Sequence, residues 1–380
     1  MTDLSLPPRI GSLRAALPFW MSLVFVPMAV AGALWGGLWL ALIPAWGFLV
    51  MSLADAISGA RTDNPDPETA EALLVWYRLI TLIWLPIHLG LIFGGLMVVS
   101  WTAHLSLVEE IAFMGGIGAV SGTVGITYAH ELVHQRTRLE RTLGEWMLIA
   151  VLYGHFKSEH VIVHHRYVGT PRDPVTARFK EGFYHFFLRV LGGQVRSAWA
   201  AETGRLARRG RPVWHRSNPF WRYGLGALGM LAVAYWIGGA FALALFVLQA
   251  LVAVTQLELV NYIEHYGLTR KHLGDGKYEH TQPHHSWNAA HRYTNYLLIN
   301  LQRHSDHHYK PDRRFPLLQT YDEADAPQLP FGYPLMIALA LNPPMFRRTM
   351  NPRVWEWRRR HYPHISYWKP YTLGTNPTPR

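Results

Sequence analysis

The chain of 380 residues is long enough for two domains of ordinary size, but half of its residues are hydrophobic and only 16% are charged. Soluble domains carry charge at about a quarter of their positions, so this composition indicates a membrane protein. The sequence has no cysteine, which excludes disulfides, thiolate metal sites and iron–sulfur or rubredoxin-type iron centres within the chain. Any electrons that the protein uses must therefore arrive from elsewhere.

The net charge of +11 is unevenly distributed. Residues 1–135 hold 4 of the 36 Lys and Arg residues but 9 of the 25 Asp and Glu residues, so the remainder of the chain is strongly basic. Basic chains often bind nucleic acid, but we expect no nucleic acid here. The surplus is better explained by the positively charged cytoplasmic face of a membrane protein, which can also attract an acidic partner.

Apolar runs of spanning length predict six transmembrane helices in three hairpins, and no cleaved targeting peptide precedes them. The predicted helices lie at about 16–35, 37–57, 74–101, 107–129, 219–238 and 240–261. An even number of spans places segments 58–72, 130–218 and 262–380 on one side, and these hold nearly every Lys and Arg. By the positive-inside rule this side is the cytoplasm. We expect one all-α integral membrane domain, 1–380, with cytoplasmic segments 130–218 and 262–380.

Nine of the 21 histidines fall into four dense clusters on the predicted cytoplasmic side. In the first, His130 and His134 are four apart and share a helical face; with Glu131 they also form the H-E-x-x-H pattern of zinc metalloproteases. In the second, His160 and His164 would share a helical face, while His165 turns about 100° away. The remaining clusters contribute His265 and the group His304, His307 and His308.

Nine histidines are too many for one ion with four to six ligands and suit two ions. Imidazole binds Zn, Cu, Fe or Ni, but a proteolytic zinc would leave six of the nine histidines unexplained. Iron that reacts with oxygen fits this set better than hydrolytic zinc. We expect no catalytic residues beyond the metal ligands. Four neighbouring carboxylates are expected to accept hydrogen bonds from the ligands' ring N–H groups rather than to bind metal: Glu131, Glu159, Glu264 and Asp306.

Other histidines lie close to these clusters. Pro283 interrupts the helical spacing around His280, His284, His285 and His291, so we expect a loop packed against the site rather than further ligands. Within the fourth span, Gly118 and Gly122 form a small-xxx-small pair. That pair is typical of close helix packing, with a ligand passage lined by backbone as the alternative.

These clusters resemble those of the membrane-bound non-haem di-iron alkane monooxygenases, the alkane ω-hydroxylases. The resemblance covers most of residues 120–357. It is carried by His130-Glu131-Leu132-Val133-His134, Glu159-His160 to His164-His165 with Thr170-Pro171-Arg172-Asp173-Pro174, Asn261-Tyr262-Ile263-Glu264-His265-Tyr266-Gly267-Leu268, and Leu301-Gln302-Arg303-His304-Ser305-Asp306-His307-His308. Two departures stand out: Val161-Ile162-Val163 replaces the family's usual Asn-Arg-Gly, and Gln135 stands where a Lys is common.

The resemblance implies a six-helix enzyme of the bacterial inner membrane with a cytoplasmic active site, in which the nine histidines hold two non-haem iron ions. It implies hydroxylation of a terminal methyl group with O₂, with electrons from rubredoxin and its reductase. An alkane has no polar handle, so the shape of a passage through the lipid-embedded helices must select it. Bulky side chains set the chain length of the substrate in such a passage, and Trp46, Trp76 and Trp84 are the candidates.

Several alternatives remain open. Fatty-acyl desaturases and aromatic-methyl or carotenoid hydroxylases use similar histidine clusters, although the His265 motif and the spacing of the last cluster favour the alkane type. From another class, an intramembrane zinc protease could be built on His130, Glu131 and His134. A non-catalytic membrane protein that handles metal is the third alternative.

Overall fold

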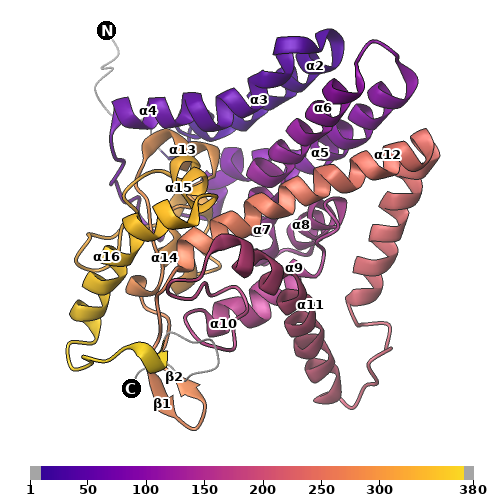
Figure 1. Ribbon diagram of the computed structural model, residues 1–380. Coiled ribbons are helices and arrows are strands. Elements are labelled where there is room, and N and C mark those ends of the chain that lie inside the picture. Colours follow the sequence, from indigo (N-terminus) through magenta and orange to yellow (C-terminus); the bar gives the residue numbers. More distant parts are fainter. Residues whose placement is uncertain (1–9, 372–380) are drawn as a thin grey trace.

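The computed structural model describes residues 10–371, and nearly all regular structure in this part of the chain is helical (Figure 1). The one sheet among these residues is a small antiparallel hairpin of β1 (His272–Gly274) and β2 (Lys277–Tyr278). The predicted all-α membrane architecture is confirmed.

Two apolar helices form a hairpin at the start of the described chain, over Leu13–Trp35 and Gly37–Ser58. The chain reverses at Gly36 and Gly37, whose φ angles of 56° and 53° lie in the left-handed region that glycine enters without steric cost. In order, the segments are α1 (Leu13–Ala16), η1 (Leu17–Val24), α2 (Phe25–Trp35), η2 (Gly37–Ala41), α3 (Leu42–Pro44), η3 (Ala45–Val50) and α4 (Met51–Ser58).

A second pair of apolar helices covers Glu71–Trp101 and Leu107–His134. The latter begins where it does because the Ser106 hydroxyl accepts from the Glu109 N–H while the Glu109 carboxylate accepts from the Ser106 N–H. Its last turns carry His130 and His134. The segments are η4 (Glu71–Leu74), α5 (Val75–Trp101), α6 (Leu107–Val120), the π-helix η5 (Ser121–Ile126) and α7 (Thr127–His134).

The longest helix, α12 (Phe220–His265), is interrupted at Gly238 and Gly239, where the backbone leaves helical geometry. A straight helix of its 46 residues would extend about 69 Å, more than twice the hydrocarbon thickness of a bilayer. Figure 1 shows two arms that diverge from a bend in this helix. Within residues 10–371, five helices are long and apolar enough to cross a membrane, with α12 counted once. The count of six spans stays a prediction.

Close packing explains the small residues of the fourth span. A Cβ at Gly118 would lie 2.6 Å from the carbonyl oxygen of Gln249, and one at Gly122 would lie 3.0 Å from that of Ala253. Both partners belong to α12, so the two helices approach each other at backbone distance. Gly122, but not Gly118, also lines the cavity described below; a ligand passage at this pair stays a prediction.

The remaining helices come from segments 130–218 and 262–371. They are α8 (Arg138–Ala150), α9 (Phe156–Ser158), η6 (Glu159–His164), α10 (His165–Tyr167), α11 (Phe183–Ala207), η7 (Pro283–His285), α13 (Arg292–Leu297), α14 (His304–Tyr309), η8 (Phe315–Leu317), α15 (Tyr333–Ala340), α16 (Pro343–His361) and η9 (Lys369–Tyr371). Two hydrophobic cores hold the structure together, and α12 contributes to both, with Phe246 in one and Tyr262 in the other. Among the elements that carry the clustered histidines, α7 contributes to the first core and α12 to both.

Candidate metal centre

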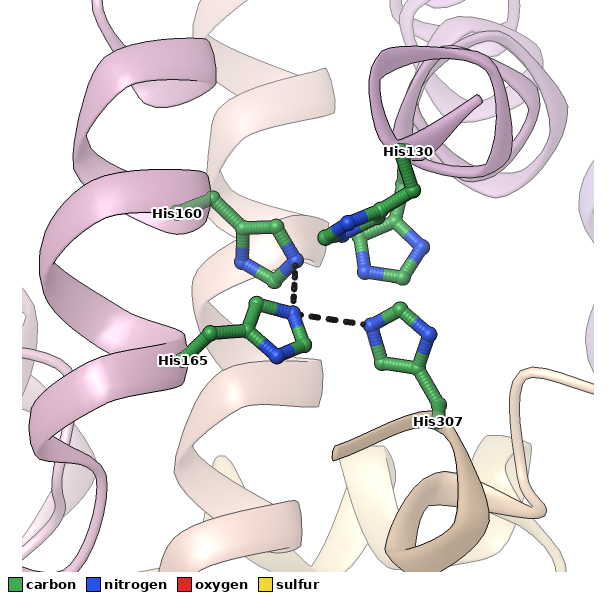
Figure 2. Close-up of side chains that lie close together, drawn as sticks. His130, His160, His165 and His307 are labelled. Carbon is green, nitrogen blue, oxygen red and sulfur yellow. Dashed lines mark hydrogen bonds between the residues drawn. The ribbon is translucent and has the colours of Figure 1, made fainter. Parts of the chain in front are cut away.

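Five of the nine predicted histidines converge at one point. Their ligand nitrogens all lie within 4.8 Å of one another, although the residues come from α7, η6, α10 and α14. The Nε2 atom of His165 lies 3.0 Å from that of His160 and 3.1 Å from that of His307, and Figure 2 shows these three rings turned toward each other. We call this the five-histidine group: His130, His134, His160, His165 and His307.

The other four predicted histidines form a second group with the same property. His304 Nε2 lies 3.1 Å from His265 Nε2 and 3.0 Å from His308 Nε2. Its members come from the end of η6, the end of α12 and α14, and their ligand nitrogens again lie within 4.8 Å of one another. We call this the four-histidine group: His164, His265, His304 and His308.

The local backbone decides how the second sequence cluster divides between the groups. Its spacing predicts that His160 and His164 share a face and that His165 points elsewhere. The rings of His160 and His164 do stack, with centroids 5.2 Å apart, but the predicted separation of His165 from His160 is wrong. Residues Glu159–His164 form a π-helix, in which the His165 N–H bonds to the His160 carbonyl five residues earlier. His160 and His165 therefore share the five-histidine group, and His164 points to the four-histidine group.

The ring nitrogens are arranged to receive a cation. Seven of the nine side chains are buried, and His134 and His165 are half-buried. A hydrogen bond places one proton between two ring nitrogens, so it cannot join three nitrogens that converge on one point. Three ring nitrogens converge in this way around His165 and again around His304. Two imidazole nitrogens bound to one ion at about 2.0–2.1 Å each lie about 3 Å apart. The observed distances of 3.0–3.1 Å fit that requirement, and both groups fit a metal site.

Burial keeps five of the nine imidazoles neutral. It lowers their pKa well below the ordinary histidine value, because the charged form loses its hydration, and neighbouring imidazoles disfavour further charge. A neutral ring offers the lone pair that a metal needs. The five are His160, His165, His304, His307 and His308.

Glu264 is the predicted carboxylate that lies nearest to the histidines. Its Oε2 atom is 3.2 Å from His304 Nε2, and its Oε1 atom accepts a 2.6 Å hydrogen bond from the Tyr333 hydroxyl. Tyr333 was not singled out from the sequence. It belongs to α15, and spacing along the chain gives no sign that this helix folds back onto the end of α12.

The other predicted carboxylates have different partners. Glu131 accepts from the Gln135 amide at 2.9 Å and from the Phe315 N–H at 3.4 Å. Asp306 accepts from Arg313, from the Tyr321 hydroxyl and from the Gln319 N–H. Glu159 is fully buried, and neither of its oxygens has a hydrogen-bond partner among residues 10–371. The roles proposed for these four carboxylates as acceptors for the metal ligands stay predictions.

Asp173 is a carboxylate that our sequence reasoning missed. Its Oδ2 atom lies 3.0 Å from His164 Nδ1 and also accepts from the Thr176 hydroxyl, while Oδ1 accepts from the Val175 N–H. It therefore fixes the ring orientation of one member of the four-histidine group. The available signal was its place in the Thr170–Pro174 motif that trails the second cluster.

The remaining histidine-rich loop packs against the site, as expected. The Trp287 N–H donates to the Glu264 carbonyl at 2.8 Å, and the Asn288 side chain contacts Ser305 on α14. Within this loop, His284 and His285 form a small cluster with Glu279, apart from the nine. His285 Nδ1 accepts from the Gln282 N–H, which ties that ring to its own loop.

A cavity of about 70 Å³ lies beside the histidines. His130, His160 and His304 form part of its wall, and the rest is mostly apolar, with Phe48 and Ile337 among the lining residues. None of the three predicted tryptophans lines it. Trp84 is fully buried against Tyr128, and the Trp76 carbonyl accepts from Trp20, whereas Trp46 directly precedes the lining residue Gly47. A role for Trp46, Trp76 and Trp84 in substrate selection stays a prediction.

Comparison with known proteins decides between the interpretations of the histidine clusters. Residues 111–340 match the family model described as fatty acid desaturase. The chain is 38% identical over 351 residues to alkane 1-monooxygenase 2 of Pseudomonas aeruginosa, which covers 88% of this chain and 91% of that protein. It is 37% identical over 348 residues to an alkane 1-monooxygenase of Pseudomonas putida, covering 89% and 84%. The chain belongs to the alkane monooxygenase family.

Within the alkane monooxygenase family the chain is an oxidoreductase embedded in a membrane, and the protease interpretation of His130, Glu131 and His134 falls away. The same scaffold extends to other substrates. A xylene/toluene monooxygenase hydroxylase component of Pseudomonas putida is 27% identical over 355 residues, 91% of this chain and 90% of that protein. This chain matches the alkane monooxygenases and also this more distant relative along most of its length. The fold alone therefore does not set the substrate.

Proposed function

We propose that the protein is a di-iron monooxygenase that hydroxylates the terminal methyl group of an alkane or a similar apolar molecule with O₂. The supporting observation is the pair of histidine groups beside an apolar cavity. Five imidazoles would hold one iron and four would hold the other. Bound iron would supply the activation of O₂, which imidazole side chains alone cannot perform.

The chain's own contribution is to hold, orient and shield this site. Asp173 fixes the ring of His164, and the Tyr333 hydroxyl holds Glu264 beside His304. Because most of the nine imidazoles are buried, bulk water is kept from the reacting groups. This protects the reaction from losing electrons and oxygen in side reactions.

The cavity gives the substrate a position. It meets the five-histidine group at His130 and His160 and the four-histidine group at His304. Its volume of about 70 Å³ suits the end of a hydrocarbon chain rather than a whole long chain. A terminal carbon would therefore reach the metal site first, and side chains such as Phe48 and Ile337 would limit its approach.

Electrons would come from rubredoxin and its reductase. The chain has no cysteine with which to bind an iron–sulfur centre of its own, and its residues beyond 135 carry most of the Lys and Arg. Such a basic region favours an acidic electron carrier by long-range attraction.

Product analysis tests the reaction. Cells that contain the protein and a working rubredoxin pathway are supplied with alkanes of several lengths, fatty acids or methylaromatics. We expect 1-alkanols from alkanes. Products from methylaromatics alone would move the substrate toward that of the xylene/toluene relative, and desaturated fatty acids would contradict the proposal.

Metal analysis of the purified protein tests the cofactor. We expect about two irons per chain, and His307→Ala should lower this to about one because the five-histidine group loses a ligand. His215→Ala is the matched control, since among residues 10–371 that side chain bonds only within its own loop, to Ser217. One zinc per chain, with peptide cleavage abolished by Glu131→Gln, would refute the proposal.

A further inference from the structure

A second and larger cavity, of about 460 Å³, has in its wall Asp173, the carboxylate that contacts His164. Its wall is formed by the loop 169–179, one face of α11, residues 267–269, and Arg358 of α16. Five arginines line it, whereas Asp173 is the only carboxylate in the described lining. The arginines are Arg172, Arg178, Arg189, Arg196 and Arg358.

Arg358 is the unusual member of this wall. It is 1% exposed, and its guanidinium carbon lies 4.2 Å from the ring centroids of both Phe179 and Trp368. These rings pack against the guanidinium but accept none of its N–H groups as a carboxylate or phosphate would, because those groups point outward in its plane. None of its three nitrogens has a hydrogen-bond partner among residues 10–371. A buried cation whose N–H groups have no acceptor is energetically unfavourable, and a bound anion would remove that cost.

The charge of Arg358 persists at neutral pH. Burial lowers the pKa of its guanidinium to about 10, because the charged form loses hydration. That value is still well above 7, so the side chain remains protonated. The cavity wall therefore keeps a full positive charge at a position that water scarcely reaches.

Further donors in the wall are also free. The Thr269 hydroxyl is buried without a hydrogen-bond partner, and neither Arg178 nor Arg196 forms an ion pair among the described residues. Arg189 is not one of these free donors, because its guanidinium is paired with the Glu181 carboxylate at 2.8 Å.

The negative charge in the wall is already engaged. Asp173 accepts hydrogen bonds through both carboxylate oxygens, from Val175, Thr176 and His164. The unpaired donors of Arg178, Arg196, Arg358 and Thr269 are therefore left with no acceptor from the wall itself.

We infer that this cavity binds a phosphate group, through Arg358, Thr269 and the neighbouring Arg178 and Arg196. These donors come from four separate elements, so they surround a ligand from several directions. A tetrahedral phosphate offers oxygens in all of those directions, whereas a carboxylate offers two in one plane. The cavity also exceeds the size of one inorganic phosphate, which leaves room for an ester substituent against Pro171, Pro174 and Leu268.

The surroundings favour the head group of an anionic phospholipid as the source of that phosphate. Helix α11 lines the cavity with Arg196 and also exposes an apolar stripe, formed by Tyr184, Leu188, Val195 and Trp199 at helical spacing. An exposed stripe of this kind on a membrane protein suits contact with lipid. Free phosphate would accept the same hydrogen bonds from these donors, but it has no apolar part that could contact the stripe.

Two binding measurements on the full-length protein, purified in a neutral detergent, separate these sources. In the first, protein reconstituted with phosphatidylcholine and phosphatidylglycerol is washed with detergent, and the phospholipids retained are quantified by mass spectrometry. In the second, radiolabelled orthophosphate is bound in equilibrium dialysis. Retention of phosphatidylglycerol over phosphatidylcholine identifies a lipid phosphate, and saturable binding of orthophosphate without such retention identifies a free one.

The variants test the assigned donors. Arg358→Gln should weaken binding about tenfold or more, since hydrogen bonds to charged groups are among the strongest in proteins. Because Arg358→Gln also removes the guanidinium that packs against Phe179 and Trp368, Arg178→Gln combined with Arg196→Gln gives a second test that leaves these contacts intact. Arg348→Gln is the control, an exposed arginine of the same helix as Arg358. Absence of both forms of binding, or equal binding by the double variant and the control, would overturn the inference.

Discussion

Asp173 shows how one carboxylate can serve two sites. It orients His164 within the four-histidine group and also forms part of the wall of the arginine-lined cavity. Removing its charge without changing its shape should loosen the hold on His164. The consequence should be specific to one of the two histidine groups, because His164 belongs to only one of them.

We expect Asp173→Asn to lower the affinity of the four-histidine group for iron about 10- to 100-fold, as loss of such supporting partners typically does. After dialysis against a chelator, the variant should keep about one iron per chain where the parent keeps about two. Asp63→Asn is the matched control, because that carboxylate pairs with Arg61 at the surface with 63% of its side chain exposed. Equal iron content in Asp173→Asn and the parent would contradict a supporting role.

The nine histidines could be predicted from the sequence because their type, number and density are unusual by themselves. Their division between two groups could not. His164 and His165 are neighbours, and a π-helical turn sends them to different groups. That turn depends on how η6 packs against its surroundings, which residue spacing does not record. Arg358 was also invisible from the sequence, since only the fold reveals that its donors are unmet.

Among the helices, the positions that could be predicted from the sequence are those of helices that must cross the bilayer. An apolar run must be long enough to cross it, so composition located the helices at Leu13–Trp35, Gly37–Ser58, Glu71–Trp101 and Leu107–His134 to within a few residues at most ends. Helix α11 (Phe183–Ala207) was not predicted, because it mixes apolar residues with arginine and glycine along its length. Its position depends on contacts with η6, α9 and α12.

The break in α12 depends on glycine in a way that can be measured. Gly239 has φ 64° and ψ −151°, a region that is essentially restricted to glycine. Gly239→Ala should lower the free energy of unfolding by about 1–3 kcal/mol through backbone strain alone, since a Cβ there would meet no atom of the described residues within 4 Å. The thermal unfolding midpoint in detergent measures this loss.

Gly224→Ala provides the comparison within the same helix. A Cβ at this position also meets nothing within 4 Å, but the backbone there is helical. Alanine is favoured over glycine in a helix by about 1 kcal/mol, so this variant should be as stable as the parent or more stable. If the two substitutions destabilised the protein equally, the backbone conformation at Gly239 would not be one that requires glycine.

For the whole molecule, the remaining question is which side of the membrane carries the histidines. The last turn of α11 and the loop after it are rich in arginine, with Arg205, Arg208, Arg209 and Arg211 close together, whereas residues 102–106 contain no Lys or Arg. The positive-inside rule then predicts that α11 and the histidine groups lie on the cytoplasmic side and residues 102–106 outside. That orientation matters for function, because a cytoplasmic electron carrier can reach only one side.

The absence of cysteine makes this orientation directly testable, since the parent protein cannot react with a maleimide. Ala103 and Ala207 are both exposed, so Ala103→Cys and Ala207→Cys introduce matched single thiols into the two loop regions. In spheroplasts, a membrane-impermeant maleimide should label Ala103→Cys at once and should label Ala207→Cys only after the membrane is opened. Labelling of Ala207→Cys in sealed spheroplasts would place the histidine groups outside the cell and exclude a cytoplasmic electron donor. The same pair also tests the number of spans between them, because an odd number of crossings must separate two thiols that lie on opposite sides.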